Sequence, residues 1–267
     1  MTEEEKKKQE KNEEEVKELN FLDHLEEMRW RLIKSLAAIM VVAIASFVFS
    51  DIFIDFLLIP ARRLGDKMII QVLKVQGMFM LKLKVAGVVG LVGAIPVIAY
   101  QVWAFVAPGL YENEKKWGKW LVLGVTFFFI SGAAFAYFVL VPFALNFLIS
   151  LGTMEIQKHI SISYYTQFVL RMLVAAGVVF QMPVLSFLLT KMGLINAKKM
   201  RKFWRYAVVI SLGLAAFITP PDPVSMMMMG IPLLFLYEFS IIVSRMAGGS
   251  ASKRRQEETE ATDQNEE

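Results

Sequence analysis

NFLDHLEEMRWRLIKSL, residues 20–36, decides the fold, because a charged polar segment becomes a membrane helix within it. Asn20 is suited to cap the start of a helix, since its side-chain oxygen can accept a hydrogen bond from a free backbone amide. An apolar stripe then follows at three- and four-residue steps, the spacing of one helix face, through Leu22, Leu25, Met28 (or Arg29) and Leu32. The residues that follow are almost all apolar as far as Phe49. We therefore expect one rigid helix that holds Glu26 and Glu27 just outside the bilayer.

The composition indicates a membrane protein that crosses the bilayer several times. Of its 267 residues, 56% are hydrophobic, and the mean hydropathy is +0.49. The apolar residues form long runs, which a soluble domain of this size does not contain. The chain has no cysteine and only two histidines, His24 and His159, so we expect no metal site and no cofactor. No nucleophile with a base and no acid–base pair can be assembled, so we do not expect an enzyme.

Six segments are apolar enough to be membrane helices, and we predict an all-α fold with both termini on one side. These segments are Arg31–Phe49, Met78–Val106, Trp120–Leu148, Tyr164–Met192, Phe203–Ile218 and Val224–Met246. The fifth is short. We expect a transmembrane domain over residues 20–246, with disordered charged tails at residues 1–19 and 247–267.

Charges in the short loops indicate the orientation. The loop Lys191–Arg205 carries several bases and no acid, whereas residues 219–224 carry no base. Short loops rich in Lys and Arg remain in the cytoplasm, so we place both termini there. The first outside segment, residues 50–77, is also basic and disagrees with this assignment, but it is longer and stands alone.

Prolines are expected to bend the membrane helices into a cupped assembly, because each removes a backbone hydrogen bond. The prolines inside the expected spans are Pro96, Pro142, Pro183 and Pro232. In the first outside segment, we expect Pro60 to end an amphipathic helix that begins near Ile52. A short strand or an extended piece is expected over Ile69–Val75.

A second unusual stretch is AFVAPGLYENEKK, residues 104–116, which the orientation places on the same side as Glu27. It presents Tyr111 and the acid Glu114. Two acidic positions on an otherwise basic face favour a receptor for a cationic ligand, with arginine preferred because a guanidinium can bind a carboxylate through two hydrogen bonds. The alternative is ordinary surface pairing, of Glu27 with Arg31 at i,i+4 and of Glu114 with a neighbouring lysine.

Three polar residues lie within the expected spans, where burying a charge is costly and polar groups tend to be functional. For Arg171 we favour a side chain that reaches toward the membrane surface. Gln181 precedes Pro183, and it either bonds backbone freed by that proline or faces a ligand. Glu238 lies in the last span.

The run Met226–Met229 follows a stiff turn, Thr219-Pro-Pro-Asp222-Pro, in which Asp222 is placed to cap the last span. Methionine side chains give a helix a soft, adaptable face. Packing between helices in lipid is one interpretation, and docking of partner helices is the other.

Several motifs, in the same order along the chain, resemble the TatC family, the core subunits of the twin-arginine protein translocase. They are HLEEMRWRL at 24–32, IPVIAYQVWAFVAPGLYENEKK at 95–116, FAYFVLVPFAL at 135–145, FQMP at 180–183, ITPPDPVS at 218–225 and IPLLFLYE at 231–238. The resemblance covers roughly residues 20–246.

The resemblance implies a receptor for twin-arginine signal peptides that exports folded proteins, using the proton-motive force. Its implied partners are the single-span subunits TatA and TatB, other TatC protomers and the membrane lipid, and no nucleic acid. It assigns the contacts with the arginines to Glu27 and Glu114. Other motif positions around that site fall on Arg29, Phe105, Pro108 and Tyr111.

Two positions depart from the family pattern. Gln181 stands where many relatives have glutamate, so a proton-linked role for that position is not expected here. Met226 replaces a residue that is often polar, which weakens a hydrogen-bonding interpretation of partner docking near Thr219 and Asp222. The rival function is a small-molecule or ion secondary transporter, which would need a polar path at the middle of the membrane. A scaffold without a ligand is the third possibility.

Overall fold

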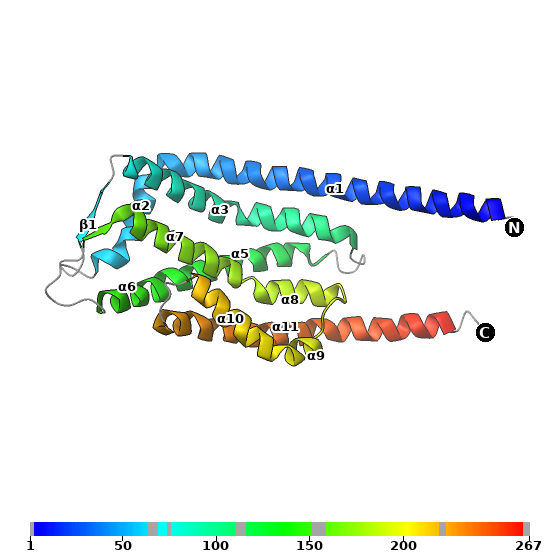
Figure 1. Cartoon of the computed structure of the whole chain (residues 1–267). Coiled ribbons are helices and arrows are strands. Elements are labelled where there is room, and N and C mark those ends of the chain that lie inside the picture. Colours follow the sequence, from blue (N-terminus) through cyan, green and yellow to red (C-terminus); the bar gives the residue numbers. More distant parts are fainter. Residues whose placement is uncertain are drawn as a thin grey trace.

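The computed structural model describes residues 3–63, 69–73, 76–109, 116–150, 159–218 and 223–263, with the backbone alone for residues 3–24 and 249–263 and at a few other positions. The helical elements are α1 (Glu3–Val48), α2 (Ser50–Arg62), α3 (Gly77–Val106), η2 (Ala107–Gly109), α5 (Gly118–Phe135), η3 (Ala136–Leu140), α6 (Val141–Ser150), α7 (Ile162–Val179), α8 (Met182–Lys191), α9 (Ala197–Lys202), α10 (Trp204–Ile218) and α11 (Pro223–Asp263). Two short strands, β1 (Ile69–Gln71) and β2 (His159–Ser161), pair in parallel at one end of the bundle (Figure 1).

The fold is that of a helical membrane protein. Among the described residues, five stretches are long and apolar enough to cross a bilayer: Leu25–Val48, Gly77–Val106, Gly118–Ser150, Ile162–Lys191 and Met226–Gly248. They coincide with five of the six segments expected from the sequence. The remaining segment forms α10, whose apolar part, Trp204–Ala216, is a shorter helix. The strand expected near Ile69 is present as β1.

The expected start of the first helix at Asn20 is wrong. Helix α1 already begins at Glu3 and passes through Asn20 without interruption, and α11 continues to Asp263. Residues 3–19 and 247–263 are therefore helical where disorder was expected. Residues 3–19 consist mostly of Glu and Lys, and residues 247–263 include Ala, Arg, Gln and Glu. These residues have high helix propensity, so a helix that starts in the membrane can continue through them.

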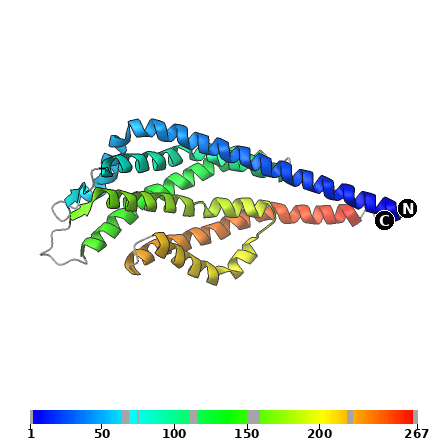
Figure 2. The same ribbon diagram turned by 45° about the horizontal axis from the view of Figure 1, so that its top comes forward.

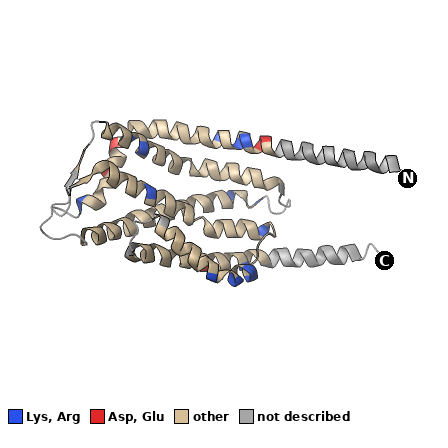
Figure 3. Ribbon diagram, viewed as in Figure 1, with Lys and Arg blue, Asp and Glu red and all other residues tan. Residues whose placement is uncertain are grey.

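Both chain ends project from the same end of the molecule, and the two-stranded ladder lies at the opposite end (Figures 1 and 2). The membrane helices between these ends are mostly uncharged, whereas Lys and Arg gather on α9 near the end that carries the termini (Figure 3). Helices α1 and α3 pack closely along their length, because Gly90 and Gly93 leave no side chain between them. A Cβ on Gly90 would overlap Ala43, and one on Gly93 would overlap Val42.

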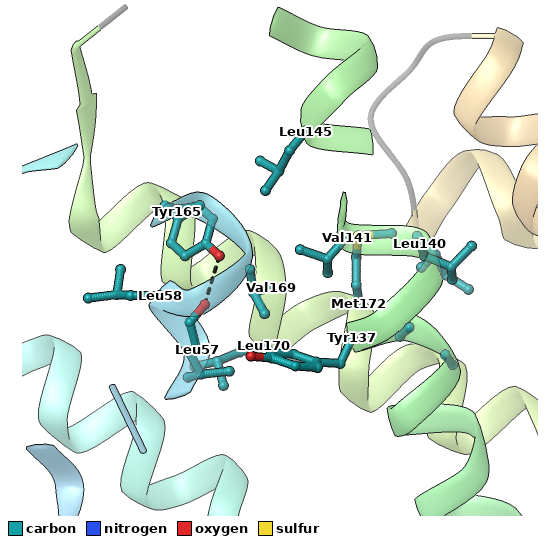
Figure 4. Packing of buried hydrophobic residues seen from close by; sticks show 14 of the residues in the cluster. Leu57, Leu58, Tyr137, Leu140, Val141, Leu145, Tyr165, Val169, Leu170 and Met172 are labelled. Carbon is teal, nitrogen blue, oxygen red and sulfur yellow. Dashed lines mark hydrogen bonds between the residues drawn. The ribbon is translucent and has the colours of Figure 1, made fainter. Parts of the chain in front are cut away.

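Helix α2 continues through Pro60 to Arg62, so the expectation that Pro60 ends it is wrong. Proline has no N–H, which leaves the carbonyl of Phe56, four residues earlier, without its helical partner. The hydroxyl of Tyr137 donates to that carbonyl at 2.6 Å, in place of the missing amide. A second hydroxyl, that of Tyr165, donates to the carbonyl of Leu57 at 2.7 Å (Figure 4).

These two tyrosines belong to a core cluster of buried side chains that joins α2, η3 and α7 (Figure 4). Its largest fully buried members include Leu81 of α3 and Met172 of α7. The core thus lies toward the end of the bundle away from the termini, and it holds the long helices together there.

The prolines of the spans have different effects. Pro142 follows η3, a π-helical turn, and Pro183 follows a break between α7 and α8. Helices α3 and α11 run without interruption through Pro96 and Pro232. The regular α-helical hydrogen-bond pattern therefore changes just before Pro142 and Pro183 but not at Pro96 or Pro232.

Candidate functional site

Glu27 lies on the exposed side of α1 and is paired with Arg31 one helical turn later. The Nε and Nη2 atoms of Arg31 donate to Oε1 of Glu27 at 3.0 and 2.5 Å. The side chains of Glu27 and Arg31 are 35% and 23% exposed, so the pair is reachable but sheltered on one side. The i,i+4 pairing anticipated from the sequence is therefore present. It orients the carboxylate along the helix and leaves it near solvent.

The packing of α1 on α3 sets the height of Glu27 in the bundle. The two helices run in opposite directions, and Ala43 lies against Gly90. Each residue advances both helices by the same rise, so equal counts from this contact bring Glu27 level with Val106, the last residue of α3. Phe105 and Pro108, in the last turn of α3 and in η2, therefore lie at about the height of the Glu27 carboxylate.

The ends of α3 and α5 are fastened to each other beside this site. The indole of Trp103 lies directly on the backbone of Gly118, where an added Cβ would overlap the ring nitrogen. Trp103 is buried with Leu121 and Leu188 in a small apolar cluster. The contact holds together the two ends of the chain segment 110–115. Tyr111 and Glu114, assigned to the site from the sequence, fall in that segment and lie outside the described residues.

Other charges around Glu27 are exposed. Glu26 and Arg29 are exposed to solvent. Arg29 is two residues from Glu27 and two from Arg31, so it lies on a different face of α1 from the ion pair. A carboxylate that is partly shielded and already binds one guanidinium is suited to bind planar cationic groups. No cluster of three metal-ligating side chains occurs within the described ranges.

Gln181 lies at the break between α7 and α8, within the apolar stretch Ile162–Lys191. Its backbone N–H donates to the carbonyl of Val178, three residues earlier, instead of to that of Gly177. Its side-chain nitrogen donates to the carbonyls of Gly177 and Val125, each at 3.2 Å. Its side-chain oxygen is buried without a partner among the described residues. The amide thus bonds the Gly177 carbonyl, which the turned N–H of Gln181 leaves open, rather than the Val179 carbonyl that Pro183 frees, and it ties α7 to α5.

The remaining sequence candidates are separate from Glu27. Glu238 of α11 is 41% exposed and forms an ion pair with Arg201 of α9 at 3.6 Å. Arg171 of α7 lines a hollow beside α3, on the half of the bundle away from the termini. Met226 is half-buried and packs against the core cluster, and Thr219 and Asp222 lie outside the described residues.

Sequence reasoning missed the hydrogen bonds that the hydroxyls of Tyr137 and Tyr165 donate to carbonyls of α2. It also missed a buried hydrogen bond between Thr190 of α8 and Ser244 of α11, at 2.8 Å. Neither has a local signal, because each pairs residues far apart in the chain.

A family model described as Sec-independent protein translocase protein (TatC) matches residues 23–232, which is most of the chain. The chain belongs to the TatC family. The match includes Glu27 on α1, the α3–α5 junction and the break at Gln181. The matched range also contains the TatC motifs named from the sequence, except for the end of the last one, at 231–238.

Similar proteins support this assignment. A protein named Sec-independent protein translocase protein TatC from Desulforapulum autotrophicum is 37% identical over 246 residues, which cover 91% of this chain and 90% of that protein. The protein of the same name from Halothiobacillus neapolitanus is 40% identical over 84% of this chain and 62% of its own length. A chloroplastic relative from Arabidopsis thaliana is 38% identical over 83% of this chain and 65% of its own length.

Solved structures of TatC share the fold. A crystal structure described as twin arginine translocase receptor TatC is 36% identical and superposes with a TM-score of 0.75, covering 84% of this chain and 99% of that chain. A second TatC structure, in the detergent DDM, gives a TM-score of 0.77 at the same identity, covering 83% of this chain and 99% of that chain. The chain is thus a multi-pass membrane protein of the Sec-independent translocase.

Proposed function

We propose that this chain is the signal-peptide receptor of the translocase and that it reads paired arginines through Glu27 and Glu114. The observation that carries the proposal is the position of the Glu27 carboxylate, oriented by Arg31 and level with the end of α3. An arginine of the peptide joins or replaces Arg31 on this carboxylate. Arg29, Phe105, Pro108 and Tyr111 complete the surroundings of the peptide.

The chemistry favours arginine over lysine. A guanidinium offers a planar pair of N–H donors to a carboxylate, whereas an ammonium acts as a compact and strongly hydrated point charge. Exposed ion pairs contribute little by themselves, so two acidic positions and burial of the apolar part of the signal peptide are needed for useful affinity. Glu27 is suited to this use because it is sheltered on one side.

The proposal includes six spans, with α10 as the short fifth span, and both termini in the cytoplasm of a bacterium. The bases on α9 support this orientation, because loops rich in Lys and Arg stay on the cytoplasmic side. We propose the single-span subunits TatA and TatB and other TatC protomers as partners, with docking at the α10–α11 turn that contains Thr219, Asp222 and Met226. Folded cargo then crosses the membrane at the expense of the proton-motive force.

The rival transporter has less support. A solute path needs polar groups open to a cavity at the middle of the membrane. The side-chain nitrogen of Gln181 instead binds two backbone carbonyls, and Gln181 carries no titratable proton. Arg171 lies on the lipid-accessible surface rather than beside Gln181.

The test is binding of a fluorescent signal peptide with adjacent arginines to the purified full chain in detergent. Glu27→Gln removes the charge but keeps the size of the side chain, and Glu26→Gln is the matched control, since Glu26 is the neighbouring exposed acid. Loss of a charge-assisted hydrogen bond costs about 1.5–3 kcal/mol, so we expect about 10- to 100-fold weaker binding for Glu27→Gln.

Glu26→Gln is expected to bind within about twofold of wild type, because rim charges contribute little. A peptide with two lysines is expected to bind much more weakly than the arginine peptide. Equal loss in both glutamine variants, or equal binding of arginine and lysine peptides, would contradict arginine recognition by Glu27.

A further inference from the structure

A hollow of about 490 Å³ opens between α3 and α7 on the half of the bundle away from the termini. Its polar wall consists of Lys84 of α3 and of Gln167 and Arg171 of α7, and its lining contains no acid. The rest of the lining is apolar and includes Val88, Leu170 and Val174. Two cationic side chains therefore share one apolar hollow in a segment that crosses the membrane.

The cations of the hollow have no anionic partner in the part of the chain that the structure describes. The Nζ atom of Lys84 donates to Oε1 of Gln167 at 2.9 Å, which positions it but does not neutralise it. Arg171 makes no hydrogen bond or ion pair with any described residue. The contrast is Lys82, two residues earlier on α3, whose Nζ pairs with the carboxylate of Asp51 at 2.8 Å outside the hollow.

Both cations lie in the first half of an apolar helix that is long enough to cross a membrane. Lys84 is about 10 Å along α3 from its start at Gly77, and Arg171 is about 13 Å along α7 from its start at Ile162. These helix starts are at the end of the bundle opposite the termini. Long basic side chains at such depths extend toward the interface, where their charges meet phosphate groups.

The floor of the hollow is open because Gly87 of α3 has no side chain. A Cβ built on Gly87 would meet no atom within 4 Å. The groove that remains, between Gly87 and the apolar side chains of α7, has space for a hydrocarbon chain below the two cations.

We propose that this hollow binds one anionic phospholipid of the leaflet away from the termini. The phosphodiester lies between Lys84 and Arg171, and an acyl chain lies over Gly87 and Val174. Charge complementarity supports this occupant, since unpaired cations at the membrane interface attract anionic lipids. A small soluble anion would match the cations but would leave the apolar floor without a partner.

The test uses the purified full chain in detergent and native mass spectrometry with added phosphatidylglycerol or phosphatidylcholine of the same acyl chains. We expect the wild type to retain phosphatidylglycerol in preference to phosphatidylcholine. Each cation near anionic lipid contributes about fivefold in affinity, so Lys84→Gln with Arg171→Gln is expected to lower the phosphatidylglycerol affinity about 25-fold.

Gly87→Leu is a second variant that fills the groove, removes no charge and places a good helix former in α3. It is expected to weaken binding of phosphatidylglycerol while the circular dichroism of the protein stays unchanged. Lys82→Gln is the matched control, because it removes a cation of the same helix outside the hollow. It is expected to bind phosphatidylglycerol within about twofold of the wild type.

Several results would overturn the proposal. Equal retention of the two lipids by the wild type would do so, as would equal losses in Lys82→Gln and in the double variant, which would indicate diffuse attraction. Normal binding of phosphatidylglycerol by Gly87→Leu would show that no acyl chain lies over Gly87. Displacement of phosphatidylglycerol by millimolar inorganic phosphate would assign the hollow to a soluble anion. Displacement of the lipid by a signal peptide would assign it to the peptide.

Discussion

Tyr137→Phe tests whether a tyrosine from another helix lets α2 continue through Pro60. The substitution removes only the hydroxyl, which donates to the carbonyl of Phe56 at 2.6 Å. The ring, which stacks on that of Phe56 with centroids 4.4 Å apart, stays in place. Leaving a shielded carbonyl unpaired costs about 1–3 kcal/mol, and hydrogen bonds between membrane helices reach about 1.7 kcal/mol. Because Pro60 has no N–H to replace the hydroxyl, we expect a loss of about 1.5 kcal/mol.

The free energy of unfolding is measured by titrating SDS into dodecylmaltoside micelles and following circular dichroism. Tyr164→Phe is the matched control, since Tyr164 is 71% exposed. We expect it to change stability by less than about 0.5 kcal/mol. Pro60→Ala restores a backbone N–H four residues after Phe56, so the loss caused by Tyr137→Phe is expected to shrink in that background. A loss no greater than that of Tyr164→Phe, or one that Pro60→Ala leaves unchanged, would refute the reasoning.

Two further substitutions test the junctions that position the candidate site. Gly118→Ala places a Cβ in the Trp103 indole, so we expect the free energy of unfolding to fall by about 1–3 kcal/mol in the same SDS titration, together with weaker binding of the arginine peptide. Gly124→Ala is the control, because its Cβ would meet no atom within 4 Å. If Gly118→Ala changes neither stability nor binding, the junction adapts to the added methyl group. Gln181→Met keeps the size of the side chain but leaves the Gly177 carbonyl without its donor, so a loss of about 1–2 kcal/mol is expected, and an unchanged transition would show that the amide does not hold the break.

The membrane helices were predictable because hydropathy is a local property. A stretch of about 20 apolar residues has few alternatives to a spanning helix, wherever it lies in the protein. Five of the predicted spans are therefore present as long apolar helices. The helix ends were less predictable: the charged residues before Asn20 continue α1, because they are good helix formers and a helix already exists to extend.

The candidate site was predictable in part. The i,i+4 spacing of Glu27 and Arg31 is a property of one helix, and their ion pair is present. The preference for Glu27 over Glu26 came from the resemblance to TatC, and the structure adds that Glu27 is the more sheltered of the two. The height of Glu27 relative to α3 depends on how two helices pack, which hydropathy does not encode.

The sequence by itself determined the membrane class, the approximate spans and the TatC family. These follow from residues that are adjacent or one helical turn apart. Only the tertiary structure decided that α2 passes through Pro60 and that Lys84 and Arg171 share a hollow. The Tyr137 hydroxyl takes the place of an amide at the Phe56 carbonyl, and these two residues are 81 positions apart in the chain. Lys84 and Gln167 are 83 positions apart. Such pairs form only when packing brings distant helices together, so no local sequence pattern predicts them.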